Sequence, residues 1–181
     1  MGSTTMPVTL RRATMDDVPP LRALMAASIG QLMDAFLTPA QVAASHELMG
    51  LDTQLIEDGT YFIAEIDGDL AGSGGWSRRA TLFGGNHTAG RSDALLVPGR
   101  DRARVRAMYT APSAARRGVG RAILAAGEDA ARAESFTAVE LAATLAGEPL
   151  YRACGYVPEL AFEEMTSNGV AVPLIRMVKP L

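Results

Sequence analysis

Two glycines separated by one residue, Gly118 and Gly120, constrain the fold of this 181-residue chain more than any other feature. They lie in the run ARRGVGRA, residues 115–122, between a strand pattern at 104–110 and a helix pattern at 118–134. Glycine lets the backbone turn tightly and approach a ligand closely. The free N–H groups at the start of the helix, together with the helix dipole, make an anion site suited to a pyrophosphate.

Three arginines, Arg116, Arg117 and Arg121, add positive charge to this turn. A solvated basic turn without a ligand has the same local pattern, so two interpretations stay open. Two other phosphate motifs are excluded. The sequence contains no G-x-x-x-x-G-K-[ST] loop, and Ile123 stands where a G-x-G-x-x-G fingerprint needs its third glycine.

The overall charge is mildly acidic, because 17 Lys and Arg residues face 20 Asp and Glu residues, for a net charge of −3. We therefore expect no general attraction to nucleic acid or to an anionic membrane. Cys154 is the only cysteine, which is compatible with a cytoplasmic location. His46 and His87 lie far apart with no cysteine at ligand spacing, so no metal is expected.

The length and the ordinary balance of apolar and charged residues predict one domain over 1–181. Residues 1–6 lack the pattern of a signal peptide, and we expect them to be disordered or left over from cloning. The most apolar stretch, 21–37, is interrupted by Arg22, Gln31 and Asp34. It is typical of an amphipathic helix rather than a membrane span.

The first half of the chain predicts two helices and a hairpin. A strand at 8–12 precedes Thr14-Met15-Asp16-Asp17, which is typical of a capping box before a helix at 16–36. A second helix is expected from Pro39 to Glu57. The stretches 61–66 and 70–76 predict a hairpin around Asp67-Gly68.

The second half begins with a long Gly-rich loop at 81–101, a length that often marks a functional segment. After the strand at 104–110, the helix at 118–134 is expected to pair Glu128 with Arg132. A strand at 137–143, a short helix at 149–154 closed by Gly155, and a hairpin of 157–165 with 170–178 complete the order. This order predicts a mixed α/β sheet.

The residues Met108-Tyr109-Thr110, Pro112 and Arg117 to Arg121 resemble the acetyl-CoA signature of the GNAT acetyltransferase superfamily, written Q/R-x-x-G-x-G/A. Tyr151, followed four residues later by Gly155 and Tyr156, is similar to a second motif of that family. The order of elements also fits, from Val8 to Lys179. Ala115 departs from the signature, which has Gln or Arg there, so the side chains that touch the phosphates stay open.

The resemblance implies a GNAT-like, mainly antiparallel sheet with a central splayed parallel strand pair and flanking helices. It also implies an N-acetyltransferase that uses acetyl-CoA as co-substrate without a metal. A backbone N–H near Met108 or Tyr109 would meet the thioester carbonyl, and Tyr151 would protonate the departing thiolate. The implied cofactor-binding residues are Met108, Tyr109, Thr110, Arg116, Arg117, Gly118, Val119, Gly120, Arg121 and Ala122.

The acceptor site is less defined. Trp76, which ends a Gly-rich strand, and Arg78 are candidates to contact the acceptor, as is Glu140. Glu140, Asp93, His87 and His46 are candidates for the base that an attacking amine needs. The loop at 81–101 is a candidate lid, with Arg78, His87, Arg91 or Asp93 reaching inward, or else a mobile surface loop.

The expected partner is a small-molecule or peptide amine, and the chain is a candidate homodimer with no nucleic-acid or membrane partner. Two alternatives stay open beside direct transfer from acetyl-CoA. One is a transferase for a longer acyl-CoA, and the other is a non-catalytic acyl-CoA-binding or regulatory domain. An acyl-cysteine route through Cys154 is the least favoured mechanism.

Overall fold

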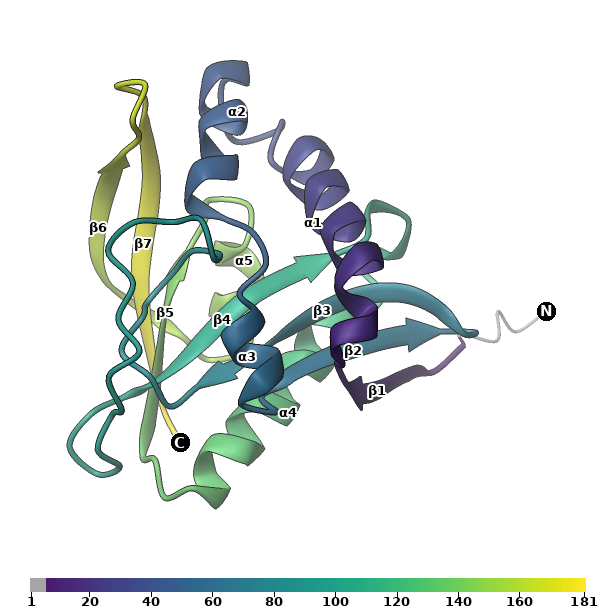
Figure 1. The fold of residues 1–181 in the computed structure, drawn as a ribbon, viewed down its shortest axis with the longest axis vertical. Coiled ribbons are helices and arrows are strands. Elements are labelled where there is room, and N and C mark those ends of the chain that lie inside the picture. The colour runs from purple at the N-terminus through teal and green to yellow at the C-terminus, as the bar shows by residue number, and fades with distance from the viewer. Residues whose placement is uncertain (1–5) are drawn as a thin grey trace.

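Seven strands form one sheet in the order β1-β2-β3-β4-β5-β7-β6 in the computed structural model, which describes residues 6–181 (Figure 1). Every neighbouring pair is antiparallel except β4 and β5, which are parallel. This arrangement confirms the predicted mixed, mainly antiparallel sheet. The strands are β1 (Val8–Arg12), β2 (Tyr61–Ile66), β3 (Asp69–Ser77), β4 (Ala103–Thr110), β5 (Ala138–Ala143), β6 (Val157–Met165) and β7 (Ala171–Pro180).

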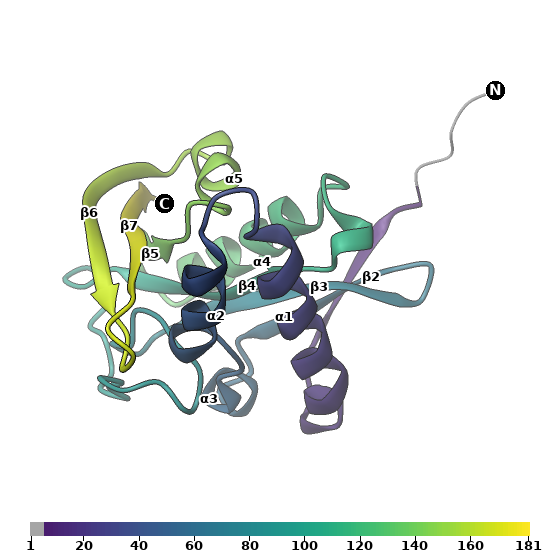
Figure 2. The same ribbon diagram turned by 90° about the horizontal axis from the view of Figure 1, so that it is seen from above.

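Helices cover both faces of the sheet: Figure 2 shows α1 and α2 on one face and α4 on the other. Short 3-10 turns precede α1 and α4. The helical elements are η1 (Met15–Asp17), α1 (Val18–Leu32), α2 (Pro39–Leu48), α3 (Thr53–Glu57), η2 (Pro112–Ala114), α4 (Val119–Ala133) and α5 (Glu148–Ala153). Within residues 6–181, none of these helices has the length and apolar character that crossing a membrane requires.

Apolar side chains fill the space on each side of the sheet. On the α1 side, Leu21, Leu55 and Tyr61 are buried in one cluster. On the α4 side, Trp76 and Leu141 are buried in another. Burial of this kind is the main force that holds helices against a sheet.

Several local predictions are confirmed. Thr14 and Asp17 form the capping box, and Asp67 and Gly68 both have positive φ at the hairpin turn, as a type I′ turn requires. The C-terminal hairpin of β6 and β7 is also present. The expectation for residues 1–5 lies outside the described part of the chain, and Met6 is exposed.

Two predicted helices have different bounds. The helix expected at 16–36 begins as the 3-10 turn η1 and its α-helical part ends at Leu32. The helix expected at 39–57 is broken into α2 and α3, because Met49 is extended and Gly50 has a φ of 144°. Asp52 then starts α3 by accepting a hydrogen bond from the Gln54 amide at 3.0 Å.

The predicted Glu128–Arg132 pair is wrong. Arg132 binds Asp129 one turn away, at the surface. Glu128 is buried, and it accepts hydrogen bonds from the Tyr156 hydroxyl and from Lys179. A buried carboxylate needs partners that are fixed in place, and the last strand of the chain supplies one of them.

Candidate active site between the parted strands

The parallel strands β4 and β5 are paired only at their beginnings. Ala103 faces Val139 and Arg104 faces Glu140, and no later residues of the two strands pair with each other. Each strand stays paired on its other side, β4 with β3 and β5 with β7. The two strands therefore part toward their C-terminal ends. A cavity of about 880 Å³ opens there, lined by both strands and by parts of α1, α2, α4, α5 and β7.

A β-bulge shapes the wall that β4 presents to this cavity. The pairing with β3 shifts between Ser73 and Gly75, and Ala107 has a φ of 52°. The Tyr61 hydroxyl donates a 2.7 Å hydrogen bond to the Ala107 carbonyl. Because Tyr61 is fully buried, this bond fixes the bulge. The cavity-lining residues of β4 are Val105, Ala107, Met108, Tyr109 and Thr110.

Tyr109 joins this strand to the start of the α2–α3 connection. Its hydroxyl accepts a 2.9 Å hydrogen bond from the Gly50 amide. Burial raises the pKa of Tyr109 to about 12, so the phenol is neutral at physiological pH. Sequence reasoning missed Gly50, since its contribution is a backbone N–H.

The Gly-containing turn leads into α4 and forms what we call the cationic end of the cavity: Arg116, Gly118, Val119, Gly120 and Arg121. Arg116 and Gly118 both have positive φ, at 61° and 81°. A Cβ on Gly118 would meet no heavy atom within 4 Å, so the left-handed backbone is its constraint. The first N–H groups of the helix have no partner within the helix.

Arg116, Arg117 and Arg121 form no ion pair with any residue among 6–181. Arg116 and Arg121 line the cavity, whereas Arg117 and Ala122 do not. Free guanidinium groups beside a helix N-terminus attract an anion through both charge and dipole. The predicted phosphate-binding residues are thus brought to one end of the cavity, apart from those two.

Tyr151, on α5, lies along the same cavity. Its ring is buried and packs edge-on against Tyr156, with ring centres 5.8 Å apart. Its hydroxyl has no hydrogen-bond partner among the described residues. Burial raises the pKa of Tyr151 above its usual range, so the hydroxyl keeps its proton at neutral pH.

The opposite end, which we call the apolar end, is built by elements outside the β4–α4–β5–α5 unit. Its side chains come from α1, the α1–α2 connection, α2, the segment before β4, and β7. They are Ile29, Leu32, Met33, Phe36, Leu48, Met49, Leu82, Phe83, Val172 and Leu174. Sequence reasoning found none of them, because they meet only in the tertiary structure.

The residues predicted for the acceptor do not line this cavity. Trp76 is buried in the core, where Arg78 lies over its ring at 5.1 Å and pairs with Glu134. Glu140 pairs with Arg104 and Arg102. The structure therefore places all three predicted acceptor residues in packing and ion pairs.

The predicted bases are also absent from the cavity lining within residues 6–181. His46 is exposed, and His87 makes a 2.7 Å hydrogen bond with the His46 carbonyl. Asp93 borders a separate, smaller pocket. The cavity lining over the described residues contains no Asp, Glu or His side chain at all.

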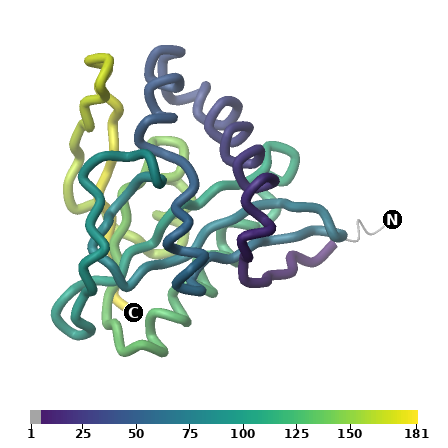
Figure 3. Tube along the Cα trace, viewed as in Figure 1, coloured from purple at the N-terminus to yellow at the C-terminus, as the bar shows by residue number. Residues whose placement is uncertain are grey.

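Residues 81–101, the segment before β4, are held by hydrogen bonds, and the residues of this segment that line the cavity differ from those predicted. Figure 3 follows this segment past α2, where Thr88 donates a hydrogen bond to the Glu47 carbonyl at 2.9 Å. The predicted Arg78, His87, Arg91 and Asp93 do not face the cavity. The residues of this segment that do are Leu82, Phe83 and Gly84.

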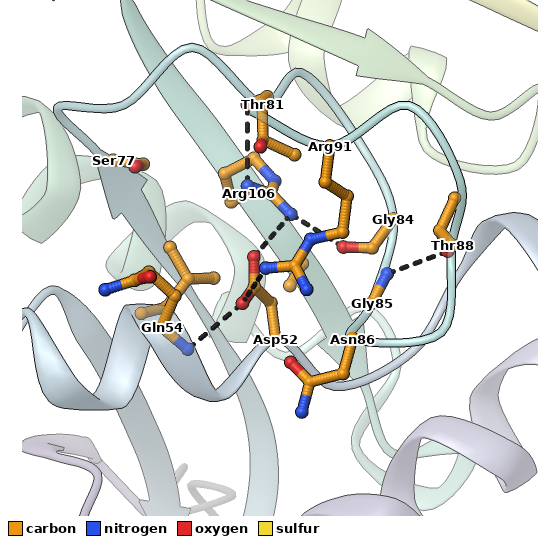
Figure 4. A network of polar contacts seen from close by, with 12 residues as sticks. Asp52, Gln54, Ser77, Thr81, Gly84, Gly85, Asn86, Thr88, Arg91 and Arg106 are labelled. Carbon is orange, nitrogen blue, oxygen red and sulfur yellow. Dashed lines mark hydrogen bonds and ion pairs between the residues drawn. The ribbon is translucent and has the colours of Figure 1, made fainter. Parts of the chain in front are cut away.

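A buried ion pair anchors that segment (Figure 4). Arg106 of β4 pairs with Asp52 at 3.0 Å, and both side chains are 2% exposed. Arg106 also donates to the carbonyls of Gly84 and Thr81, at 2.6 and 3.4 Å. Arg91 binds the other oxygen of Asp52 at 2.5 Å. This network holds residues 81–84 as a fixed wall of the cavity.

Comparison with known proteins gives a family match. The model of the acetyltransferase (GNAT) family matches residues 29–156, which is more than half of the chain. A search of curated proteins found no match. Three similar solved structures share between 12% and 21% sequence identity with this chain. At this level of identity they show the fold alone.

A GCN5-related N-acetyltransferase from Rhodopseudomonas palustris aligns with a TM-score of 0.70 and 21% identity, over 99% of this chain and 100% of that one. The PaiA N-acetyltransferase from Thermoplasma acidophilum, solved with coenzyme A, aligns with a TM-score of 0.64 and 12% identity, over 97% of this chain and 100% of that one. A ribosomal-protein-alanine N-acetyltransferase from Brucella melitensis aligns with a TM-score of 0.60 and 19% identity, over 96% of this chain and 99% of that one.

Proposed function

The chain belongs to the acetyltransferase (GNAT) family, and on that premise we propose that it is an N-acetyltransferase that moves the acetyl group of acetyl-CoA to a primary amine. Both substrates would be bound at once, and the amine would attack the thioester directly. One observation carries the proposal: a single cavity joins the free arginines at the start of α4 to the unpaired Tyr151 hydroxyl.

The cationic end fits the diphosphate of an acyl-CoA. Arg116 and Arg121 line it without an internal partner, and no carboxylate among the described residues opposes them there. The left-handed backbone at Gly118 aims the first N–H groups of α4 outward. The pantetheine arm would then lie in the gap where β4 and β5 part.

The middle of the cavity supplies the groups that the transfer needs. The bulge at Ala107 lies in the cavity wall beside Met108 and Tyr109, and a backbone N–H there would stabilise the carbonyl oxygen as charge develops on it. Tyr151 would protonate the departing sulfur, because burial of the side chain raises its pKa and the phenol keeps its proton at neutral pH.

Direct transfer is favoured over an acyl-cysteine route. Cys154 follows α5, and it is not among the residues that line the cavity. Its thiol therefore has no defined path to the thioester.

The first test is a thermal melt with excess acetyl-CoA, with NAD and ATP as controls. A ligand that binds only the native state raises the melting temperature. We expect acetyl-CoA to raise the melting temperature more than NAD or ATP does. In Arg121→Glu, the increase with acetyl-CoA should be smaller than in the wild type. Arg22→Glu makes the same charge change at an exposed arginine of α1 outside the cavity, and it should keep the full shift. No shift with acetyl-CoA would reject the donor.

Tyr151→Phe tests catalysis separately from binding. We expect it to keep the acetyl-CoA shift and to lower the release of free thiol by about a hundredfold or more, as expected for loss of a general acid. Wild-type turnover in this variant would remove Tyr151 from the mechanism. Acetyl-CoA binding without turnover on any amine, in the wild type, would favour the non-catalytic alternative.

A longer acyl-CoA is the second candidate donor, and the apolar end of the cavity is the observation that favours it. The fatty chain of such a donor would be stabilised by burial at the apolar end, as a hydrophobic acceptor would be. Melting shifts and turnover with acetyl-, hexanoyl- and octanoyl-CoA separate the two donors.

A further inference from the structure

Three side chains at the apolar end line the cavity without contributing to the core. Leu32, Phe36 and Leu82 belong to none of the buried apolar clusters among the described residues. Phe36 is 48% exposed. Apolar surface that faces a cavity rather than the core marks a place where a ligand is bound.

The carboxylates and the imidazole near the apolar end either lie outside the cavity lining or have partners of their own among the described residues. Asp34 is exposed on the α1–α2 connection and is not part of the cavity lining. The other neighbouring groups have partners of their own: Glu47 accepts from Ser167, Asp52 pairs with Arg91 and Arg106, and His87 binds the His46 carbonyl.

A protonated amine would therefore enter this end of the cavity without a counter-ion. Burying an unpaired ammonium is costly, and the group responds by losing its proton. The charged side chains that do line the cavity are Arg116 and Arg121, which are cations themselves and cannot act as its counter-ion. The lining thus selects against the charged form of the acceptor.

We propose that the acceptor is an apolar amine whose nitrogen is neutral near pH 7, as in an aromatic amine. This inference rests on the proposed function. It joins two observations, the apolar side chains and the absence of any Asp, Glu or His side chain from the lining over the described residues. A nitrogen that is already neutral needs no base before it attacks.

The reaction balances with the groups present. The nitrogen lone pair forms a bond to the acetyl carbonyl carbon, and the carbon–sulfur bond breaks. The sulfur takes the Tyr151 proton, and the surplus proton of the nitrogen passes to water, from which Tyr151 is reprotonated. The products are an amide and a free thiol, so thiol release measures the reaction.

The test compares two isomers with the same atoms, 4-ethylaniline and 2-phenylethylamine, using the full-length protein and acetyl-CoA. We measure kcat/KM between pH 6 and 9, with a blank that lacks the protein. At pH 7 we expect 4-ethylaniline to be favoured by about tenfold or more, with a nearly flat pH profile. For 2-phenylethylamine we expect a rise of about tenfold per pH unit, because its neutral fraction grows at that rate below its pKa. A preference for 2-phenylethylamine at pH 7 would overturn the inference.

A carboxylate placed at the rim tests the missing counter-ion directly. Phe36 is half exposed, so a polar replacement there leaves the core intact. Phe36→Glu should raise kcat/KM for 2-phenylethylamine at pH 7 several-fold over Phe36→Gln, its neutral match. The two variants should differ much less with 4-ethylaniline. Equal kinetics of the two variants with 2-phenylethylamine would contradict the inference.

Other outcomes assign the apolar end to a different occupant and also overturn the inference. A larger melting shift and faster turnover with octanoyl-CoA than with acetyl-CoA would give it to the donor. Acetylation of an apolar peptide while both isomers fail would give it to a polypeptide. If acetyl-CoA does not raise the melting temperature of the wild type, the proposed function is rejected as well. If acetyl-CoA raises it but the enzyme prefers the protonated amine, 2-phenylethylamine, this inference alone is rejected.

Discussion

Leu150 Cδ2 lies 2.5 Å from the position that a Cβ on Gly120 would occupy. Gly120 is buried at the start of α4, and Leu150 is on α5, one residue before Tyr151. The second glycine of the turn therefore allows two helices to approach, in addition to bordering the cationic end. This contact sets how far Tyr151 lies from the start of α4.

Gly120→Ala should destabilise the domain by about 1–3 kcal/mol, because its Cβ overpacks against Leu150. Leu150→Ala removes the atom that it meets, so the double variant should be more stable than the sum of the two single changes by about 1 kcal/mol. Urea unfolding of the four proteins measures this coupling. Additive changes would show that Gly120 does not pack against Leu150.

The buried hydroxyl of Tyr61 is expected to hold the bulge of β4 in its catalytic shape. Tyr61→Phe leaves the Ala107 carbonyl without its donor, which should cost about 1–3 kcal/mol of stability. We also expect kcat to fall by about tenfold or more, since small misplacements at an active site have large effects.

Ser73→Ala is the matched control for that change. It removes the other partner of the Tyr61 hydroxyl, at 2.9 Å, and keeps the bond to Ala107. Its kcat should stay close to that of the wild type. Similar kcat values for the two variants would mean that the Ala107 bond does not position the bulge.

The Asp52–Arg106 pair should decide whether residues 81–84 stay in place. Arg106→Met leaves the buried Asp52 carboxylate with Arg91 as its one remaining cationic partner and should destabilise the domain by about 3–5 kcal/mol. Loosening of the segment should also speed trypsin cleavage after Arg91. Arg102→Met removes more exposed ion pairs and should cost no more than about 1 kcal/mol. Unchanged cleavage in Arg106→Met would show that other contacts hold the wall.

The capping box at the start of α1 predicts a pH dependence of stability. The Arg11 guanidinium holds the pKa of Asp17 down to about 2, below its ordinary value of 3.8. The folded state therefore gains stability above the unfolded pKa and loses it as the pH falls from about 4 to about 2. Asp17→Asn should cost on the order of 1 kcal/mol at pH 7, since Arg11 is partly exposed.

Urea unfolding at pH 7, 4 and 2.5 checks this sign. The difference in free energy of unfolding between wild type and Asp17→Asn should become smaller as the pH falls. Asp16→Asn changes an exposed neighbour that has no hydrogen bond among the described residues and should follow the wild type at each pH. A gap that widens at low pH would refute the assignment.

The sequence by itself determined the features that depend on neighbours along the chain. The Thr14–Asp17 capping box, the Asp67-Gly68 turn and the Gly118 turn are each set by residues a few positions apart. Such local signals have the same physical meaning in any fold. The cationic end of the cavity could be predicted for that reason, because its arginines and glycines are consecutive.

Only the tertiary structure decided the other end of the cavity and the fate of the charged candidates. Leu32, Leu82 and Val172 are far apart in sequence and meet because the sheet brings α1, the segment before β4 and β7 together. Glu140 was a reasonable base in the sequence, yet its strand pairing places it beside Arg104. Whether a charged side chain is free or paired depends on its spatial neighbours, which no local pattern specifies.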